Sequence, residues 1–328
     1  MKKLNKKHAL MFAVPFVIIG SIFSVVRLSN QKTDNLQYEF VIDIGEKNYR
    51  KVYLLDENQY LIPLSIDVSK KEYLVDEIYT VISNLRDLNV VGFSNILAED
   101  VKINHIELEN GVLNIDFSKE FLTYQKQLEE KIIESLTWSV LDFEEVQGLT
   151  ISVDGVKLEK MPLNGFVLPS ILNENIGINK YHDLTSNYQN SDSVVVLYQK
   201  EVNGNIYYVP VTRRVDYDSN KVNGIISVLS KDISVLSGLN KIELTKELSI
   251  DDISYIDNRV SVNLDETYLI EDNLIDTDMY KLLMVTFSYN NLDTEISFYI
   301  NNESVEVNGY NNQDEQSVSQ IVFNEINV

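Results

Sequence analysis

Residues able to perform acid–base, nucleophilic or metal chemistry are few in this 328-residue chain, and they do not cluster. The chain has no cysteine, and of its three histidines only His105 and His182 lie beyond an apolar N-terminal run. Zinc sites and cysteine–histidine catalysis need several such groups close together, so the sequence predicts neither. His105 falls on an expected strand, where an imidazole is usually exposed or paired with a neighbour. We therefore expect no metal and no cofactor.

Adjacent carboxylates occur at Asp56-Glu57, Asp251-Asp252 and Glu271-Asp272, where an acid–base pair is conceivable. A catalytic pair needs a cleft that separates its two pKa values. All three pairs fall instead at expected turns or helix starts, where carboxylates cap backbone N–H groups or are solvated. The chain also has no Gly-rich phosphate loop, serine-centred elbow or HExxH motif. The sequence therefore predicts a protein that is not an enzyme.

Four residues are candidates for contact with another protein. Trp138, the one tryptophan, lies one step off the apolar stripe of its expected helix, so it marks either an exposed interaction face or ordinary core or edge packing. Arg213 and Arg214 form a basic pair in an acidic region, which either grips an acidic partner or ends a solvated strand. Gly204 lies at the tip of an expected hairpin, where a partner contact can change without disturbing the core.

The elements that position these residues occur twice, at an offset of 147 residues. Tyr60 aligns with Tyr207 and Pro63 with Pro210, and a long series of apolar positions aligns in the same way. Polar positions mostly differ, as expected when two copies keep a core while their surfaces diverge. A period this long predicts two self-sufficient domains.

Each copy is predicted to be an α+β domain in the order strand, strand, helix, strand, strand, helix, strand, with two helices covering one mixed or antiparallel sheet. The first hairpin comprises residues 52–55 and 60–66, and its counterpart has a loop four residues longer. Asn110-Gly111 and its counterpart Asp257-Asn258 are turn residues that tolerate positive φ. The second helix carries apolar residues at a spacing of four in both copies: Leu128, Ile132, Leu136 and Val140, then Ile275, Met279, Leu283 and Phe287.

Charge and hydropathy separate the N-terminus from the rest. Five of the 28 basic residues and no acidic residue lie in residues 1–30, which leaves 23 basic against 50 acidic residues elsewhere. So acidic a surface repels nucleic acid, and we expect no nucleic-acid partner. Residues 9–26 carry no charge, and a helix of that length rises about 27 Å, enough to span a bilayer. The preceding lysines predict a cytoplasmic N-terminus with the bulk outside; a cleaved signal peptide is the alternative.

These patterns predict seven segments: a cytoplasmic tail (1–8), a transmembrane anchor (9–26), a stalk (27–45), a first α+β domain (46–160), an apolar interdomain linker (161–190), a second α+β domain (191–308) and a polar tail (309–328). The linker is too apolar for a free tether, so we expect much of it to pack against one or both domains. The tail is rich in Asn, Gln and Ser and is expected to fray, with residues 321–323 docking weakly.

Several segments resemble the GerM family of spore-former proteins. In the second half these are IYYVPVTRRV and, just before that domain, FVLPSILNENIGINKYHDL; in the first half they are VYLLDENQYLIPLSIDV, ENGVLNIDFSKEF and LTISVDGVKL. The resemblance implies two tandem GerMN domains, similar in shape to ring-building motifs. It also implies a membrane-tethered, extracytoplasmic, non-enzymatic protein of sporulation and germination.

By the same resemblance, the protein would sit on the mother-cell membrane facing the forespore. There it would assemble or localise a complex between the two membranes, with other sporulation membrane proteins and as a homo-oligomer or ring. Family members are commonly lipoproteins, whereas this chain has no cysteine and would use residues 9–26 as its anchor. GerMN domains also occur in accessory proteins of sensor kinases, so an envelope sensor or ligand-binding module beside a membrane kinase is the alternative. An envelope hydrolase is a third.

Overall fold

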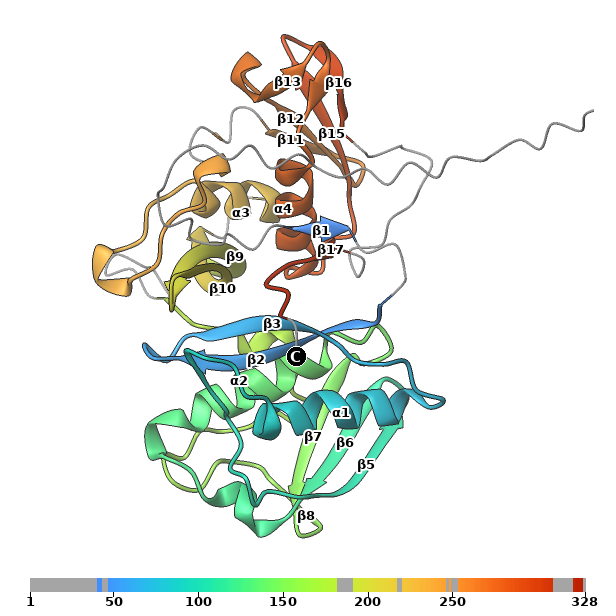
Figure 1. Ribbon diagram of the computed structural model, residues 1–328, viewed down its shortest axis with the longest axis vertical. Coiled ribbons are helices and arrows are strands. Elements are labelled where there is room, and N and C mark those ends of the chain that lie inside the picture. The colour runs from blue at the N-terminus through green and yellow to red at the C-terminus, as the bar shows by residue number, and fades with distance from the viewer. Residues whose placement is uncertain are drawn as a thin grey trace, which may run out of the picture. The chain divides into compact units, whose positions relative to one another are not determined.

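The computed structural model describes residues 40–42, 47–181, 191–216, 220–245, 248, 253–308 and 321–326 (Figure 1). The predicted cytoplasmic tail, the predicted anchor and most of the predicted stalk lie outside the described residues. No helix within the described ranges combines the length and apolar character needed to cross a membrane. All the described residues belong to one compact unit.

The first domain follows the predicted order, with two short strands added. Its elements are β2 (Tyr49–Asp56), β3 (Leu61–Asp67), α1 (Leu74–Asp87), β4 (Phe93–Ser94), β5 (Ile103–Glu109), β6 (Val112–Phe117), α2 (Glu129–Val140), β7 (Gly148–Val153) and β8 (Val156–Lys157). β6 pairs antiparallel with β5 and parallel with β7. The sheet is therefore mixed.

The hairpin β2–β3 is separate from this sheet, which corrects the prediction of two helices on one sheet. β2 pairs with β3 and β4, whereas β5 to β8 form a sheet of their own. α1 contacts both β2 and β5, and α2 contacts both β2 and β7, so the helices lie between the hairpin and the sheet (Figure 1). Apolar spacing reports one stripe per helix and cannot show that a helix is covered on two sides.

The second domain repeats this plan. Its elements are β9 (Ser191–Val202), β10 (Asn205–Asp216), α3 (Lys221–Leu229), β11 (Ile253–Ile256), β12 (Arg259–Asn263), β13 (Leu269–Glu271), β14 (Leu274–Ile275), α4 (Thr277–Ser288), β15 (Glu295–Ile300) and β16 (Glu303–Val307). β12 pairs antiparallel with β11 and parallel with β15, as β6 does with β5 and β7. An added hairpin, β13–β14, extends the sheet beside β16.

Two-residue turns with positive φ close the predicted hairpins. φ is 51° at Asn110 and 79° at Gly111, and it is 49° at Asp257 and 62° at Asn258. Asn, Asp and Gly tolerate this conformation best, so these turns are confirmed. The predicted longer loop in the first hairpin of the second copy is wrong. β9 and β10 are each 12 residues long, and only residues 203–204 connect them, because that Asn-Gly pair forms a tight turn.

The predicted linker packs onto the folded core over the part that is described, residues 161–181. Met161, Leu172 and Ile178 are all buried. The expectation that this apolar segment packs rather than hangs free is therefore confirmed for those residues.

The end of the predicted polar tail forms a strand. β17 (Ile321–Val322) pairs antiparallel with β1 (Val41–Ile42), and Phe323 is 1% exposed. The expected docking of residues 321–323 is therefore confirmed, whereas the expected fraying is wrong for residues 321–326. Three apolar residues in a polar stretch gave a weak signal, because the partners that cover them lie far away in sequence.

Phe323 is predicted to be a main contributor to the packing of this segment. Its ring lies 5.5 Å from that of Phe40 and 6.3 Å from that of Tyr208, centre to centre. Phe323→Ala should lower the free energy of unfolding by about 3–5 kcal/mol, because it leaves a cavity. Urea denaturation of the full chain in detergent, followed by Trp138 fluorescence, measures this. The exposed Val91→Ala variant serves as the control and should stay within about 0.5 kcal/mol of wild type; equal losses would contradict the assignment.

Candidate functional site: the contact between the two domains

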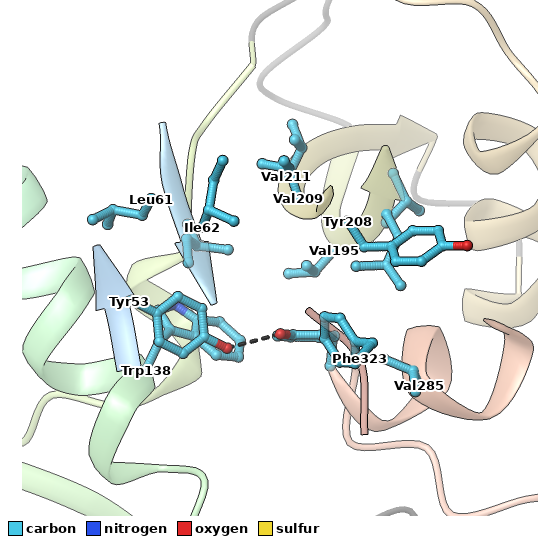
Figure 2. Packing of buried hydrophobic residues seen from close by; sticks show 14 of the residues in the cluster. Tyr53, Leu61, Ile62, Trp138, Val195, Tyr208, Val209, Val211, Val285 and Phe323 are labelled. Atoms are coloured by element: carbon cyan, nitrogen blue, oxygen red, sulfur yellow. Dashed lines mark hydrogen bonds between the residues drawn. The ribbon is translucent and has the colours of Figure 1, made fainter. Parts of the chain in front are cut away.

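The two domains meet through their first hairpins. β3 contacts β10, and Figure 2 shows Leu61 and Ile62 on one side of the contact with Val209 and Val211 on the other. β3 is buried at six successive positions and β10 at seven, so both faces of these strands are covered. Strands covered on both faces read as continuous apolar runs rather than alternating ones, as residues 61–64 do.

Asn179 joins the two hairpins through its side-chain amide. Its Nδ2 donates to the carbonyl oxygens of Leu61 at 2.7 Å and Pro210 at 2.9 Å, and its Oδ1 accepts from the Leu61 N–H at 2.9 Å. The residue is buried and has a φ of 46°, which asparagine tolerates. One side chain thus satisfies three buried backbone groups, one of them in the other domain.

Asn324 does the same from the opposite end of the chain. Its Nδ2 donates to the carbonyl oxygens of Pro63 and Tyr208, both at 2.8 Å, and its Oδ1 accepts from the Tyr208 N–H at 2.8 Å. It too is buried, with a φ of 52°. Tyr208 and Pro210 are the repeat equivalents of Leu61 and Pro63, at the offset of 147 residues. The two asparagines therefore make the same bonds with the domains exchanged.

The segment after each domain also adds backbone bonds to the hairpin of the other domain. The Thr212 N–H donates to the Ile178 carbonyl at 2.8 Å, and the Tyr181 N–H donates to the Thr212 carbonyl at 3.0 Å. Ser65, the equivalent of Thr212, donates its N–H to the Asn324 carbonyl at 3.1 Å. Each domain is thus bound by the segment that follows the other.

A buried ion pair crosses the contact. Lys200 Nζ lies 3.4 Å from Asp56 Oδ2, and their side chains are 6% and 0% exposed. Lys200 Nζ also donates to Asn58 Oδ1 at 2.9 Å. The other oxygen of Asp56 accepts from the N–H groups of Asn58 and Tyr60 at 3.0 and 2.7 Å. The turn-capping role predicted for the first acidic pair is therefore confirmed for Asp56.

Trp138 lies at this contact and not on an exposed face, which corrects one of its two predicted placements. The side chain is 6% exposed, and its Nε1 donates to the Gly177 carbonyl at 2.8 Å. Its ring lies 5.4 Å from that of Tyr289, centre to centre. The Tyr289 hydroxyl is hydrogen-bonded to that of Tyr53 at 2.8 Å, across the two domains. The placement off the apolar stripe arises because the linker covers that side of α2.

Of the predicted basic pair, Arg213 packs inside the protein and Arg214 is half-buried. Arg213 is 3% exposed, and its guanidinium lies over the rings of Tyr181 and Tyr198, at 4.9 and 5.8 Å from their centres. Arg214 Nε donates to Ser191 Oγ at 2.6 Å. Neither the exposed grip nor the solvated strand end describes Arg213, since the rings of Tyr181 and Tyr198 pack against its guanidinium.

The other predicted residues lie apart from the contact's asparagines. Gly204 is exposed at the β9–β10 turn, where its role in a partner contact stays a prediction, and His105 and Glu271 are exposed on strands. His182 and residues 251–252 lie outside the described residues. Within the described ranges, no three His, Cys, Asp or Glu side chains are grouped to hold a metal ion.

A buried carboxylate that sequence reasoning missed fixes the linker to the first domain. Glu129 Oε1 accepts from the N–H groups of Leu163 and Asn164 at 2.5 and 2.6 Å and from the Tyr124 hydroxyl at 2.8 Å. Its Oε2 accepts from the Phe166 N–H at 3.3 Å. Burial acts to raise the pKa of Glu129, but the hydrogen bonds outweigh it and lower that pKa. The carboxylate is therefore a structural anion.

Glu134 shows the opposite shift. Its Oε2 accepts from the Asn179 N–H at 3.2 Å and from Lys131 Nζ at 3.1 Å, and Lys180 Nζ lies 3.8 Å from its Oε1. Burial nevertheless raises the pKa of Glu134, because the two lysines compensate only in part for its desolvation. This carboxylate supports Asn179 from the α2 side.

A cavity of about 390 Å³ lies beside the contact, lined by both domains. Trp138, Tyr289 and Phe323 contribute to its wall, and so do Lys51 and Asp142. Lys51 Nζ lies 2.5 Å from Asp142 Oδ1, so these charged groups already pair with each other. The volume suits a small ligand, but this pair leaves neither charge free to hold one.

Comparison with known proteins identifies this organisation. Residues 51–159 match the Germane family, described as sporulation and spore germination. The spore germination protein GerM of Bacillus subtilis (strain 168) is 29% identical over 198 residues, covering 58% of this chain and 53% of that protein. The solved tandem GerMN domains of the sporulation protein GerM from Bacillus subtilis match 84% of this chain and 99% of that one, with 25% identity and a TM-score of 0.66. This chain is a GerM-like protein with two tandem GerMN domains.

The chain spans about half the length of that curated GerM relative. Within the GerM-like chain, the repeat continues past the GerMN domains themselves. IGIN at residues 176–179 corresponds to IVFN at residues 321–324, at an offset of 145 rather than 147. This shift of two residues hid the asparagines from an alignment at constant offset. The signal in the sequence is the match between the segments that follow the two domains, which appears only when offsets near 147 are also compared.

Glu129→Gln is predicted to destabilise this GerM-like protein in a pH-dependent way. The folded pKa lies below the unfolded value of about 4.3, so the stabilisation is complete above that pH and is lost as the pH falls through the folded pKa. The variant should lose about 1.5–3 kcal/mol of unfolding free energy near neutral pH, and the loss should shrink in acid. Urea denaturation across pH measures it. The neighbouring half-exposed Glu130→Gln should change little; a pH-independent loss for Glu129→Gln would contradict the assignment.

The two bridging asparagines are predicted to contribute equally to stability. Asn179→Gly and Asn324→Gly keep a residue that tolerates positive φ but leave buried backbone groups unpaired. Each should lower the free energy of unfolding by about 2–4 kcal/mol. Asn110→Gly, at an exposed turn with the same sign of φ, is the matched control and should stay within about 0.5 kcal/mol. Chemical denaturation compares the three; an effect confined to one bridging asparagine would refute the exchange relation between them.

Proposed function

We propose that this GerM-like protein is a membrane-anchored, extracytoplasmic, non-enzymatic scaffold of sporulation or germination. The observation that carries the proposal is its likeness, over 84% of the chain, to the tandem GerMN domains of a sporulation protein. In this role it assembles or localises a complex between the mother-cell and forespore membranes. Its partners are other sporulation membrane proteins.

The use of buried polar groups supports a scaffold. The side chains of Asn179 and Asn324 form hydrogen bonds that join the domains, and Asp56 and Lys200 pair across the same contact. The 50 acidic residues against 28 basic ones favour a partner with a cationic protein surface. These features are those of a protein that presents surfaces.

The anchor in this proposal is the uncharged run at residues 9–26, with the N-terminus cytoplasmic and both GerMN domains outside, facing the forespore. A homo-oligomer or ring extends the proposal. The net charge of −22 opposes self-association at low ionic strength, so such rings form more readily when salt screens the charge.

The proposal predicts a defined position in the sporulating cell. A fluorescent fusion that replaces the native gene should concentrate at the membranes around the forespore, and deletion should lower the yield of heat-resistant or germinating spores. A fusion lacking residues 9–26 is the control and should lose the membrane signal. Even fluorescence over vegetative envelopes, with normal sporulation and germination in the deletion strain, would overturn the proposal. Enrichment of a membrane kinase on the purified protein would instead favour the sensor alternative.

A further inference from the structure

The contact between the GerMN domains has the same parts on both sides. Leu61 and Tyr208 are equivalent in the repeat, and so are Pro63 and Pro210. Each of these positions bonds to a bridging asparagine in the pattern of its equivalent. A contact that uses one patch of both partners is isologous, the kind that joins two copies of one protein.

The ion pair at this contact also joins equivalent positions. The Asp56 N–H donates to the Tyr60 carbonyl at 3.0 Å, so Asp56 faces Tyr60 across the first hairpin. Lys200 lies opposite Tyr207 in the second hairpin. Because Tyr60 and Tyr207 are equivalent in the repeat, Asp56 and Lys200 occupy the same place in the two domains. The strand before the turn is therefore offset by 144 residues rather than 147.

We propose that this surface is a self-recognition surface of the GerMN domain, which the Asp56–Lys200 pair makes selective. Between two first domains, Asp56 would face a second Asp56 without a counter-ion. Between two second domains, two copies of Lys200 would meet. Burying like charges against each other is costly, whereas the unlike pair is compensated. The occupant of each surface is thus a GerMN domain of the other type, from the same chain or from a second copy.

The surroundings of the lysine support a directed contact. Three groups of the first domain contact the ammonium of Lys200. They are the carboxylate of Asp56 at 3.4 Å, the Oδ1 of Asn58 at 2.9 Å and the ring of Tyr60 with its centre at 5.4 Å. The first domain is therefore built as an acceptor for a buried cation, which the second domain supplies.

The test uses the full chain in detergent, with a protease site placed within residues 182–190 and then cut. An isotope-labelled and an unlabelled preparation are unfolded together in urea, refolded by dilution and weighed by native mass spectrometry. The expected result is complexes of one first half with one second half, with labels mixed at random. Halves that do not associate after refolding, or pairs of like halves in the wild type, would overturn the proposal.

Charge removal then tests the selectivity. The double variant Asp56→Asn/Lys200→Met should pair without discriminating between like and unlike halves, so that like pairs appear beside unlike ones. Asp56→Asn alone leaves a buried lysine and should weaken the pairing of unlike halves about a hundredfold or more. Near-ultraviolet circular dichroism of the uncut double variant checks that its fold is kept.

The matched control removes a half-buried ion pair inside the first domain. Lys51→Met with Asp142→Asn neutralises a pair that does not cross the contact, and unlike pairing should stay exclusive. If the Asp56→Asn/Lys200→Met variant also pairs only unlike halves, the charge pair does not select the partner and the proposal fails.

Discussion

The outer edges of β3 and β10 are buried, and a buried strand edge must find hydrogen-bond partners for its backbone groups. β3 pairs with β2 on one side and β10 pairs with β9, so each strand has one edge left. The amides of Asn179 and Asn324 supply the partners there, and each bonds to both hairpins. An amide suits the task because it carries donors and an acceptor in one plane. The linker and the C-terminal segment bring these two side chains into place.

The path of the linker shows this dependence. Glu129 fixes the linker where it turns back over the first domain, Trp138 Nε1 holds the Gly177 carbonyl, and the next residues deliver Asn179 to the hairpins. At the far end of the chain, β17 pairs with β1, and this pairing places Asn324 beside the two hairpins in the same way. Segments that read as a linker and a tail are therefore structural parts of the contact.

Local signals predicted the parts of this fold that depend on local chemistry. Asn110-Gly111 and Asp257-Asn258 specify their turns because few other residues adopt positive φ, and the repeated apolar positions marked both cores. The sequence did not reveal that the helices lie between hairpin and sheet, because each helix shows a single apolar stripe. Arg213 and Trp138 were candidates for surface contacts. The adjacent sequence does not indicate that tyrosine rings pack on Arg213 or that a carbonyl of the linker binds Trp138. Asn179 and Asn324 escaped notice because their partners lie in other segments.

The bond between Ser65 Oγ and the Phe323 carbonyl joins residues separated by 258 positions. A ribosome makes the chain from its N-terminus, so the first hairpin emerges long before its last partner exists. During that interval the edge of β3 lacks the segment that later covers it. In the proposed extracytoplasmic location, a chain exported as it is made spends most of its synthesis with an unpaired strand edge exposed, and chaperones of the envelope have to protect that edge.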